Sequence, residues 1–222
     1  MGQRLIITGT DTDIGKTVFS AALMMGLETA GHKPHYWKPI QSGVSDGVDT
    51  RTVQQYTNLP NERFLPERYL FTESLSPHRA AEIDGTSIDM DELRDPACIP
   101  ACDGTLIIEG AGGLMVPLSR ENLLINLWQK WNIPVVLCAR TGLGTINHTL
   151  LSLEALWSRN IPVKGLVFIG EENMDNIRTI SEFSKVKILG HLPQIDYIDD
   201  TSLQLAFGNS FNARVFMEEQ DE

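Results

Sequence analysis

A glycine-bounded loop near the start of the chain, GTDTDIGKT at residues 9–17, follows the apolar run QRLIIT and precedes a segment with helical periodicity. Gly9 and Gly15 permit the tight turn that aims backbone N–H groups at an anion, and the following helix adds its positive end. Lys16 can reach the β- and γ-phosphates of a nucleotide, and the Thr17 hydroxyl can bind Mg²⁺. Five residues separate the glycines instead of four, so a chance GKT after an ordinary turn is the alternative. The strand–loop–helix context favours a phosphate-binding loop in an α/β fold.

Buried-type strands and amphipathic helices alternate along the rest of the chain. Strands are predicted at residues 4–9, 35–40, 105–110, 134–139, 163–169 and 186–191. Helices are predicted at residues 16–30, 48–56, 122–131, 145–158 and 175–184. This alternation predicts one domain over residues 1–222, with a mainly parallel β-sheet covered by helices on both faces. Residues 58–80 and 110–113 are predicted to be irregular, and about 215–222 to be a frayed acidic tail.

Charge and composition limit the kinds of partner that this protein can bind. A formal net charge of −11 argues against nucleic acid, which requires a basic surface. No apolar run approaches the roughly 20 residues of a membrane span, and too few residues precede the first predicted strand for a signal peptide. We therefore expect a cytoplasmic protein with no membrane partner. The three cysteines lack the spacing of a zinc site, so we expect idle thiols.

Two carboxylates of the loop, Asp11 and Asp13, are unexpected beside a triphosphate, because like charges repel. Their presence indicates a cation close by. Mg²⁺ is one candidate, and a positively charged substrate is the other.

Several further segments form a pattern with this loop. They are WKPIQSG (37–43), DTRT (49–52), SPHRAA (76–81), IIEGAGG (107–113) and GTINHTLLSLEAL (144–156). Together with the loop at 9–17 they resemble the dethiobiotin synthetase family, in order, up to about residue 170. The resemblance implies a P-loop NTPase-like fold and a ligase that uses ATP and Mg²⁺.

The resemblance also implies a reaction, a step of biotin biosynthesis. Carbon dioxide, or bicarbonate as its source, forms a carbamate on one amine of 7,8-diaminopelargonate. ATP phosphorylates the carbamate to a carbamic-phosphoric anhydride, and the second amine closes the cyclic urea of dethiobiotin. A diamine substrate accounts for the acidic loop, since carboxylates favour binding of ammonium groups.

Residue roles follow from the match to the family. The implied Mg²⁺ ligands are Thr17, Asp49 and Glu109; the implied catalytic residues are Thr12 and the two cations Lys16 and Lys38. The implied ATP-binding residues are Asp13, Ile14, Gly15, Lys16, Thr17, Val18 and Pro193. The residues implied to line the diamine and carbamate site are Thr12, Asp13, Lys38, Ser42 and Gly112. Simpler readings remain open: Asp49 could cap a helix, Lys38 could be solvated, and Ser42 could be a turn residue.

The far carboxylate of the substrate needs a hydrogen-bond donor. In the family it binds at a helix N-terminus across a dimer interface, and the matching residues here are Gly144, Thr145, Ile146 and Asn147. The match implies a homodimer in which each site borrows from its neighbour. A plain glycine-containing loop is the alternative.

Some features fall outside the match. The family commonly reads adenine with an asparagine after the strand at 163–169, where this chain has Phe168, Ile169 and Gly170. We therefore expect either loose base selectivity or base recognition by backbone groups near His191 to Gln194. His78 and His148 are expected to pack or cap rather than catalyse. Another P-loop ligase, or an ATPase switch, is the rival reading; the switch ATPases of partition and division carry a lysine where this chain has Asp11.

Overall fold

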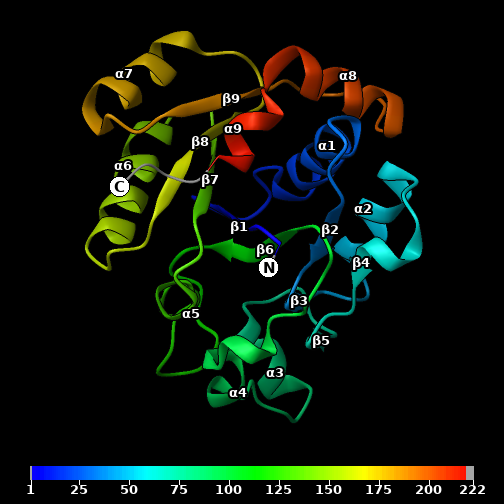
Figure 1. Ribbon diagram of the computed structural model, residues 1–222. Helices are drawn as coiled ribbons and strands as arrows, with labels where there is room; N and C mark the ends of the chain where they lie inside the picture. The colour runs from blue at the N-terminus through cyan, green and yellow to red at the C-terminus, as the bar shows by residue number, and fades with distance from the viewer. Residues whose placement is uncertain (1, 219–222) are drawn as a thin grey trace.

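A central parallel sheet organises the molecule (Figure 1). The computed structural model describes residues 2–218. Seven strands lie in the order β4-β2-β6-β1-β7-β8-β9, and their pairings are parallel. The strands are β1 (Arg4–Gly9), β2 (Pro34–Trp37), β4 (Phe64–Leu65), β6 (Thr105–Gly113), β7 (Val135–Arg140), β8 (Val163–Ile169) and β9 (Ile188–Leu192). Because β1 lies in the middle, the loop that follows it sits between β6 and β7 at the carboxyl edge.

Helices cover both faces of this sheet, as predicted. One face carries α1 (Lys16–Thr29), α2 (Asp49–Thr57), α8 (Asp200–Ser210) and α9 (Ala213–Met217). The other carries α3 (Pro77–Ile83), α4 (Met90–Arg94), α5 (Leu124–Trp131), α6 (Thr145–Trp157) and α7 (Met174–Ser184). Successive side chains of β1 point to opposite faces of the sheet, so each face has its own hydrophobic core. Leu5 and Ile7 pack under α1, while Ile6 packs on the opposite side. Burial of each such side chain contributes roughly 1.5–3 kcal/mol.

The strand predicted at 35–40 is divided by Pro39, and the second piece joins another sheet. Strand β3 (Ile40–Ser42) pairs in parallel with β5 (Tyr69–Phe71). The carbonyl of Pro39 accepts hydrogen bonds from the backbone N–H groups of Arg68 and Tyr69, at 2.9 and 3.0 Å. The prediction of an irregular 58–80 was therefore wrong in part, because it holds β4, β5, a short 3₁₀ turn at Asn61–Arg63 and the start of α3.

The predicted loop at 110–113 is strand instead. Strand β6 continues to Gly113, which pairs with Gly9 after a register shift. A side chain at Gly113 would place a Cβ 3.3 Å from the carbonyl oxygen of Thr10, so glycine lets this strand end lie against the phosphate loop.

Two C-terminal helices, α8 and α9, were not predicted, and the tail is not frayed from residue 215. Phe216 is fully buried, and its ring lies 6.1 Å from that of Phe19 and 5.9 Å from that of Phe207. The acidic residues of FMEEQDE indicated a solvated tail, although its first residue, Phe216, is buried. Residues 219–222 of the predicted tail lie outside the described residues.

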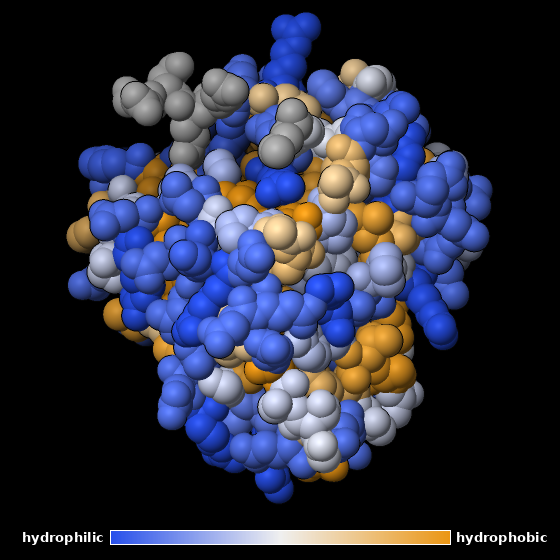
Figure 2. All heavy atoms as spheres, turned by 60° about the horizontal axis from the view of Figure 1, so that its bottom comes forward, coloured by the Kyte–Doolittle hydropathy of each residue, from blue (hydrophilic) through white to orange (hydrophobic). Residues whose placement is uncertain are grey.

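The molecular surface is largely polar on the face that Figure 2 draws. Figure 2 shows a mainly hydrophilic face on which apolar residues gather in separate patches. Across residues 2–218, none of the helices has both the length and the apolar character needed to cross a bilayer.

Candidate active site

The loop between β1 and α1 has the geometry of a phosphate-binding turn. Gly15 caps α1 with a φ of 93°, and Asp13 also has a positive φ, 52°. A Cβ at Gly15 would lie 2.8 Å from Cγ2 of Ile169, so both the backbone angle and the space favour glycine. The Lys16 ammonium donates to the carbonyl oxygen of Asp11 at 2.9 Å, which holds the lysine over its own loop.

A buried carboxylate, Glu109 on β6, is the centre of the site. One of its oxygens accepts hydrogen bonds from the hydroxyl of Thr17 at 2.8 Å and the ammonium of Lys38 at 3.2 Å. The other accepts from the hydroxyls of Ser20 at 2.8 Å and Tyr36 at 3.0 Å. The Glu109 side chain is fully buried, so these four donors replace the water that an ionised carboxylate requires.

The strand register explains how Lys38 reaches this centre. Strand β2 pairs with β6 so that Tyr36 lies opposite Ile107 and Trp37 opposite Ile108, which continues to Lys38 beside Glu109. The ammonium also contacts the carboxylate of Asp49, the first residue of α2. The backbone N–H of Asp49 donates to the side-chain oxygen of Gln41 at 3.1 Å, so α2 is fixed at its start.

Burial and charge shift the pKa values of these groups. Burial raises the pKa of Glu109, but the nearby ammonium groups of Lys38 and Lys16 outweigh it and the pKa is lowered. Burial opposes the charge of Lys38, yet Glu109 and Asp49 raise its pKa. Burial lowers the pKa of Lys16. Burial, together with Glu109, raises the pKa of Tyr36 well above its usual value, so its hydroxyl remains a donor. Glu109 and Lys38 are therefore both charged.

The predicted Mg²⁺ ligands fit that ion. Thr17 and Glu109 are hydrogen-bonded, and Lys38 joins Glu109 to Asp49, so three hard oxygen donors surround one region. Mg²⁺ prefers oxygen ligands and takes few of them from protein when phosphates and water supply the others. Among residues 2–218 there is no cluster of three or more His, Cys, Asp or Glu side chains that could enclose a metal.

The predicted substrate residues line the same carboxyl edge. Gly112 has a φ of 64°, and a Cβ there would lie 3.0 Å from the hydroxyl of Thr12, so β6 ends against the phosphate loop. The hydroxyl of Ser42 is buried without a hydrogen-bond partner. An orphaned hydroxyl at this edge is available to a ligand.

The predicted carboxylate-binding segment is the start of α6. Gly144 caps the helix with a φ of 92°, and the Thr145 hydroxyl donates to the backbone oxygen of Arg140 at 2.5 Å. The N–H of Thr145 is already used in a turn to Gly142, at 3.2 Å. The next N–H groups lack intrahelical partners, as at any helix start. Leu143 beside them has a relative exposure of 108%.

Known proteins resemble this chain over nearly its whole length. The AAA domain family AAA_26 matches residues 3–202. An "ATP-dependent dethiobiotin synthetase BioD" from Rhodopseudomonas palustris (strain BisB18) is 50% identical over 97% of this chain and 99% of its own. The proteins of that name from Brucella anthropi and Agrobacterium fabrum are each 48% identical, over 97% and 98% of this chain and 98% and 99% of theirs. The chain belongs to the dethiobiotin synthetase family.

Solved structures support the fold of this synthetase. The MinC:MinD cell division protein complex of Aquifex aeolicus has a chain of TM-score 0.54 at 11% identity, matching 100% of this chain and 98% of that one. The apo McdA structure from Cyanthece has a TM-score of 0.55 at 14% identity, over 93% and 91% of the two chains. These likenesses confirm the predicted P-loop NTPase-like class.

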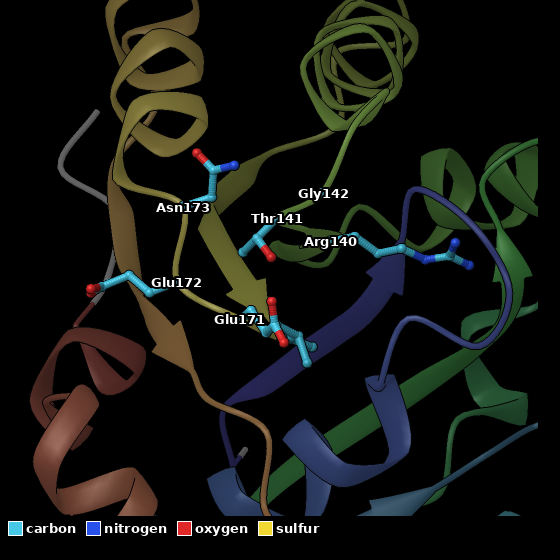
Figure 3. Close-up of a pocket in the computed structure, with 8 residues that line it drawn as sticks. Arg140, Thr141, Gly142, Glu171, Glu172 and Asn173 are labelled. Atoms are coloured by element: carbon cyan, nitrogen blue, oxygen red, sulfur yellow. The ribbon is translucent and has the colours of Figure 1, made fainter.

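The open end of the synthetase site lies beyond β7 and β8. A cavity of about 340 Å³ is lined by Arg140, Thr141, Gly142, Ile169, Gly170, Glu171, Glu172 and Asn173 (Figure 3). Asn173 caps α7 by accepting from the backbone N–H of Asn176 at 3.1 Å, so its oxygen already has a structural partner. The carbonyl of Gly170 lies 2.7 Å from a ring nitrogen of His191. Pro193 is exposed just after β9.

The remaining ATP-site predictions and the two histidines can also be placed. Ile14 is buried, and Val18 packs against the α1 core. His78 is half-buried, with its ring 3.0 Å from the hydroxyl of Ser76, and His148 is exposed on α6. Within residues 2–218, neither histidine is a hydrogen-bond partner of Glu109 or Lys16.

Sequence reasoning missed four residues that support the synthetase site: Ser20, Tyr36, Gln41 and Arg140. Ser20 lies three residues after Thr17, so one helix face carries both hydroxyls, and this spacing was a usable signal. Tyr36 precedes Lys38 by two residues, which places both on one strand face. Gln41 contacts Asp49 across a loop, and Arg140 contacts Thr12, 128 residues away, so neither contact follows a helix or strand spacing.

Proposed function

We propose that this chain, a member of the dethiobiotin synthetase family, converts 7,8-diaminopelargonate, carbon dioxide and ATP into dethiobiotin, ADP and phosphate. The observation that carries the proposal is the convergence of Lys16, Thr17, Lys38 and Glu109 beside the phosphate loop, in a chain about half identical to named synthetases over its full length. The enzyme is an ATP-dependent ligase. We take residues 1–222 as one synthetase domain and place its reaction in the cytoplasm, where ATP is supplied.

The reaction has three bond-forming steps. One substrate amine attacks carbon dioxide, loses a proton and becomes a carbamate. A carbamate oxygen then attacks the γ-phosphorus of ATP, and ADP leaves. The second amine attacks the carbamoyl carbon, and the carbon–oxygen bond breaks to release phosphate as the ring closes.

Lys16 and Lys38 supply positive charge where the phosphoryl group is transferred. Lys16 reaches the phosphates when it leaves the Asp11 carbonyl, and Lys38 is held beside Glu109 on the opposite side. Positioned charges of this kind act without reorganising during the reaction. Thr17, Asp49 and Glu109 would hold Mg²⁺. Held there, the ion would supply positive charge that offsets the negative charge of the phosphates.

The remaining predicted residues would surround the phosphates and the diamine. Thr12 lies against Gly112, within reach of a carbamate in the cleft, and Ser42 offers its unpaired hydroxyl. Asp13, in the turn before Gly15, adds negative charge for the substrate ammonium groups. Pro193 would pack near the base.

We further propose a homodimer in which residues 144–147 bind the far carboxylate of the partner's substrate. Exposed apolar side chains support an interface there, namely Leu143 at 108% exposure and Leu151 and Trp157 on α6 at 56% and 46%. Light scattering should give twice the chain mass. A Leu143→Asp variant should be monomeric and inactive, while Leu205→Asp, at an exposed site on α8, should remain dimeric. A fully active monomer would refute this part.

The reaction itself is tested by phosphate release. Purified protein receives MgATP with diaminopelargonate and bicarbonate, singly and together, and product mass is measured. Release only with both, with a cyclic-urea product, is expected. Lys38→Met should lose activity, whereas Lys33→Met, at an exposed lysine paired with Asp103, should not. Release without the diamine and no new product would refute the synthetase reaction.

A further inference from the structure

Arg140, at the end of β7, lines the cavity in Figure 3, and its side chain turns toward the segment between β1 and α1. Its guanidinium donates to the carbonyl oxygen of Thr12 at 2.9 Å. It also lies 3.5 Å from a carboxylate oxygen of Asp11. These contacts join residues 128 positions apart in the chain and place a cation against the outer side of the phosphate loop.

These contacts explain how a phosphate-binding loop can contain the carboxylate of Asp11. One oxygen of Asp11 accepts from the backbone N–H of Thr12 at 2.8 Å, and the other faces Arg140. The Asp11 charge is thus offset within the protein, before a diamine or metal arrives. An unpaired Asp11 would instead face the incoming polyphosphate, and like charges at close range oppose binding.

A second link runs through the backbone of the same residue. The carbonyl oxygen of Arg140 accepts from the hydroxyl of Thr145, which is 4% exposed and opens α6. One residue therefore fixes the Asp11–Thr12 segment by its side chain and the start of α6 by its main chain.

We infer that Arg140 is a positioning residue for nucleotide binding: it pairs with Asp11 and fixes the Thr12 carbonyl, so that the loop presents its N–H groups to the phosphates of MgATP. The inference rests on the proposed function only in taking this loop as the ATP site. Both side chains of the pair are about half exposed, at 53% and 54%, so the ion pair alone is weak and the effect is expected to be moderate.

The test measures equilibrium MgATP binding by calorimetry, without the diamine. Arg140→Gln should weaken binding by about tenfold, because it loses a charge-assisted contact and leaves Asp11 unpaired. Arg140→Lys should retain part of the affinity. Arg178→Gln, which removes an exposed arginine paired with Glu182 on α7, is the matched control and should bind like wild type.

The decisive arm is a double-mutant cycle. In the Asp11→Asn background, Arg140→Gln should weaken binding much less, because the unpaired charge is gone. Equal losses in both backgrounds, or a loss in Arg140→Gln no greater than in Arg178→Gln, would overturn the inference. Thermal unfolding of each variant reports on folding. Wild-type turnover of diaminopelargonate is assayed in parallel, so that failure of the reaction is distinguished from failure of this role.

Discussion

The two ends of the proposed nucleotide site are built differently. At the phosphate end, Glu109 accepts four side-chain hydrogen bonds and is fully buried. At the open end beyond β7 and β8, the cavity exposes Glu171 and Glu172, while its other polar groups serve the protein itself. There the carbonyl of Thr141 accepts from the side chain of Asn176 at 2.8 Å, and Asn173 caps a helix.

The difference indicates which end of the site determines the specificity of the protein. A buried carboxylate with four donors has little freedom to move, so the groups around the transferred phosphoryl are preorganised. The open end offers a base no comparable network. We expect substitutions at the phosphate end to affect turnover strongly, and those at the open end to alter base preference or stability.

The largest effect is expected for Glu109→Gln. The amide keeps the shape of the side chain but removes the charge that pairs with Lys38 and would help hold Mg²⁺, so turnover should fall by about a hundredfold or more. Glu171→Gln, the same change at the open end, should keep turnover within about threefold. Steady-state kinetics of dethiobiotin formation compares them, and similar losses in both variants would remove the distinction between the two ends.

A smaller effect is expected for Tyr36→Phe. The variant deletes one donor to Glu109 but leaves the Ser20 hydroxyl on the same oxygen. A hydrogen bond to a charged group contributes roughly 1.5–3 kcal/mol, so unfolding by urea should show a loss of about that size. Tyr197→Phe, at a tyrosine that is 76% exposed, is the control and should be neutral. An equally stable Tyr36→Phe would mean that Ser20 alone satisfies this oxygen.

The phosphate end was largely predictable from sequence because its key elements are contiguous. The apolar run of β1, the loop and α1 follow one another, and Glu109 follows the continuous apolar run of β6 directly. Its partners were less visible, because the contact of Tyr36 with Glu109 depends on β2 pairing with β6 across a long stretch of chain. Burial of Phe216 likewise requires α8 to pack on α1, whereas the local sequence has the composition of an acidic tail.

The open end resisted prediction for a physical reason. Asn173 follows the end of β8 at Ile169, and its capping of α7 depends on where that helix begins. Arg140 gave no local signal, since its partners are set by the adjacency of β7 and β1. Contacts between loops that lie far apart in the chain depend on the order of the strands in the sheet. That order is set by long-range strand pairing, which local sequence patterns do not reveal.

Base preference gives the next test of the comparison. Ile169 stands at the end of β8 in place of an asparagine that could read the base. GTP or CTP should therefore support turnover within about a hundredfold of ATP. A site built to hydrogen-bond a particular group of its ligand would reject ligands that lack this group far more strongly. Ile169 contacts the position of Gly15 in the phosphate loop. Ile169→Asn should therefore sharpen the preference for ATP. A wild-type enzyme that rejects every other nucleotide more strongly than this would show that backbone groups suffice to read the base.

The smallest effect on turnover is expected for Asn173→Ala. Because the Asn173 oxygen accepts from the N–H of Asn176, its removal should cost about 1 kcal/mol of stability, as for other helix caps. Turnover with ATP should stay within about twofold of wild type, since the cap serves α7 rather than the base. Asn173→Ser, which can still cap, should recover the stability. If Asn173→Ala instead raised KM for ATP without altering stability, the asparagine would be a nucleotide ligand, and the open end would be more specific than its geometry indicates.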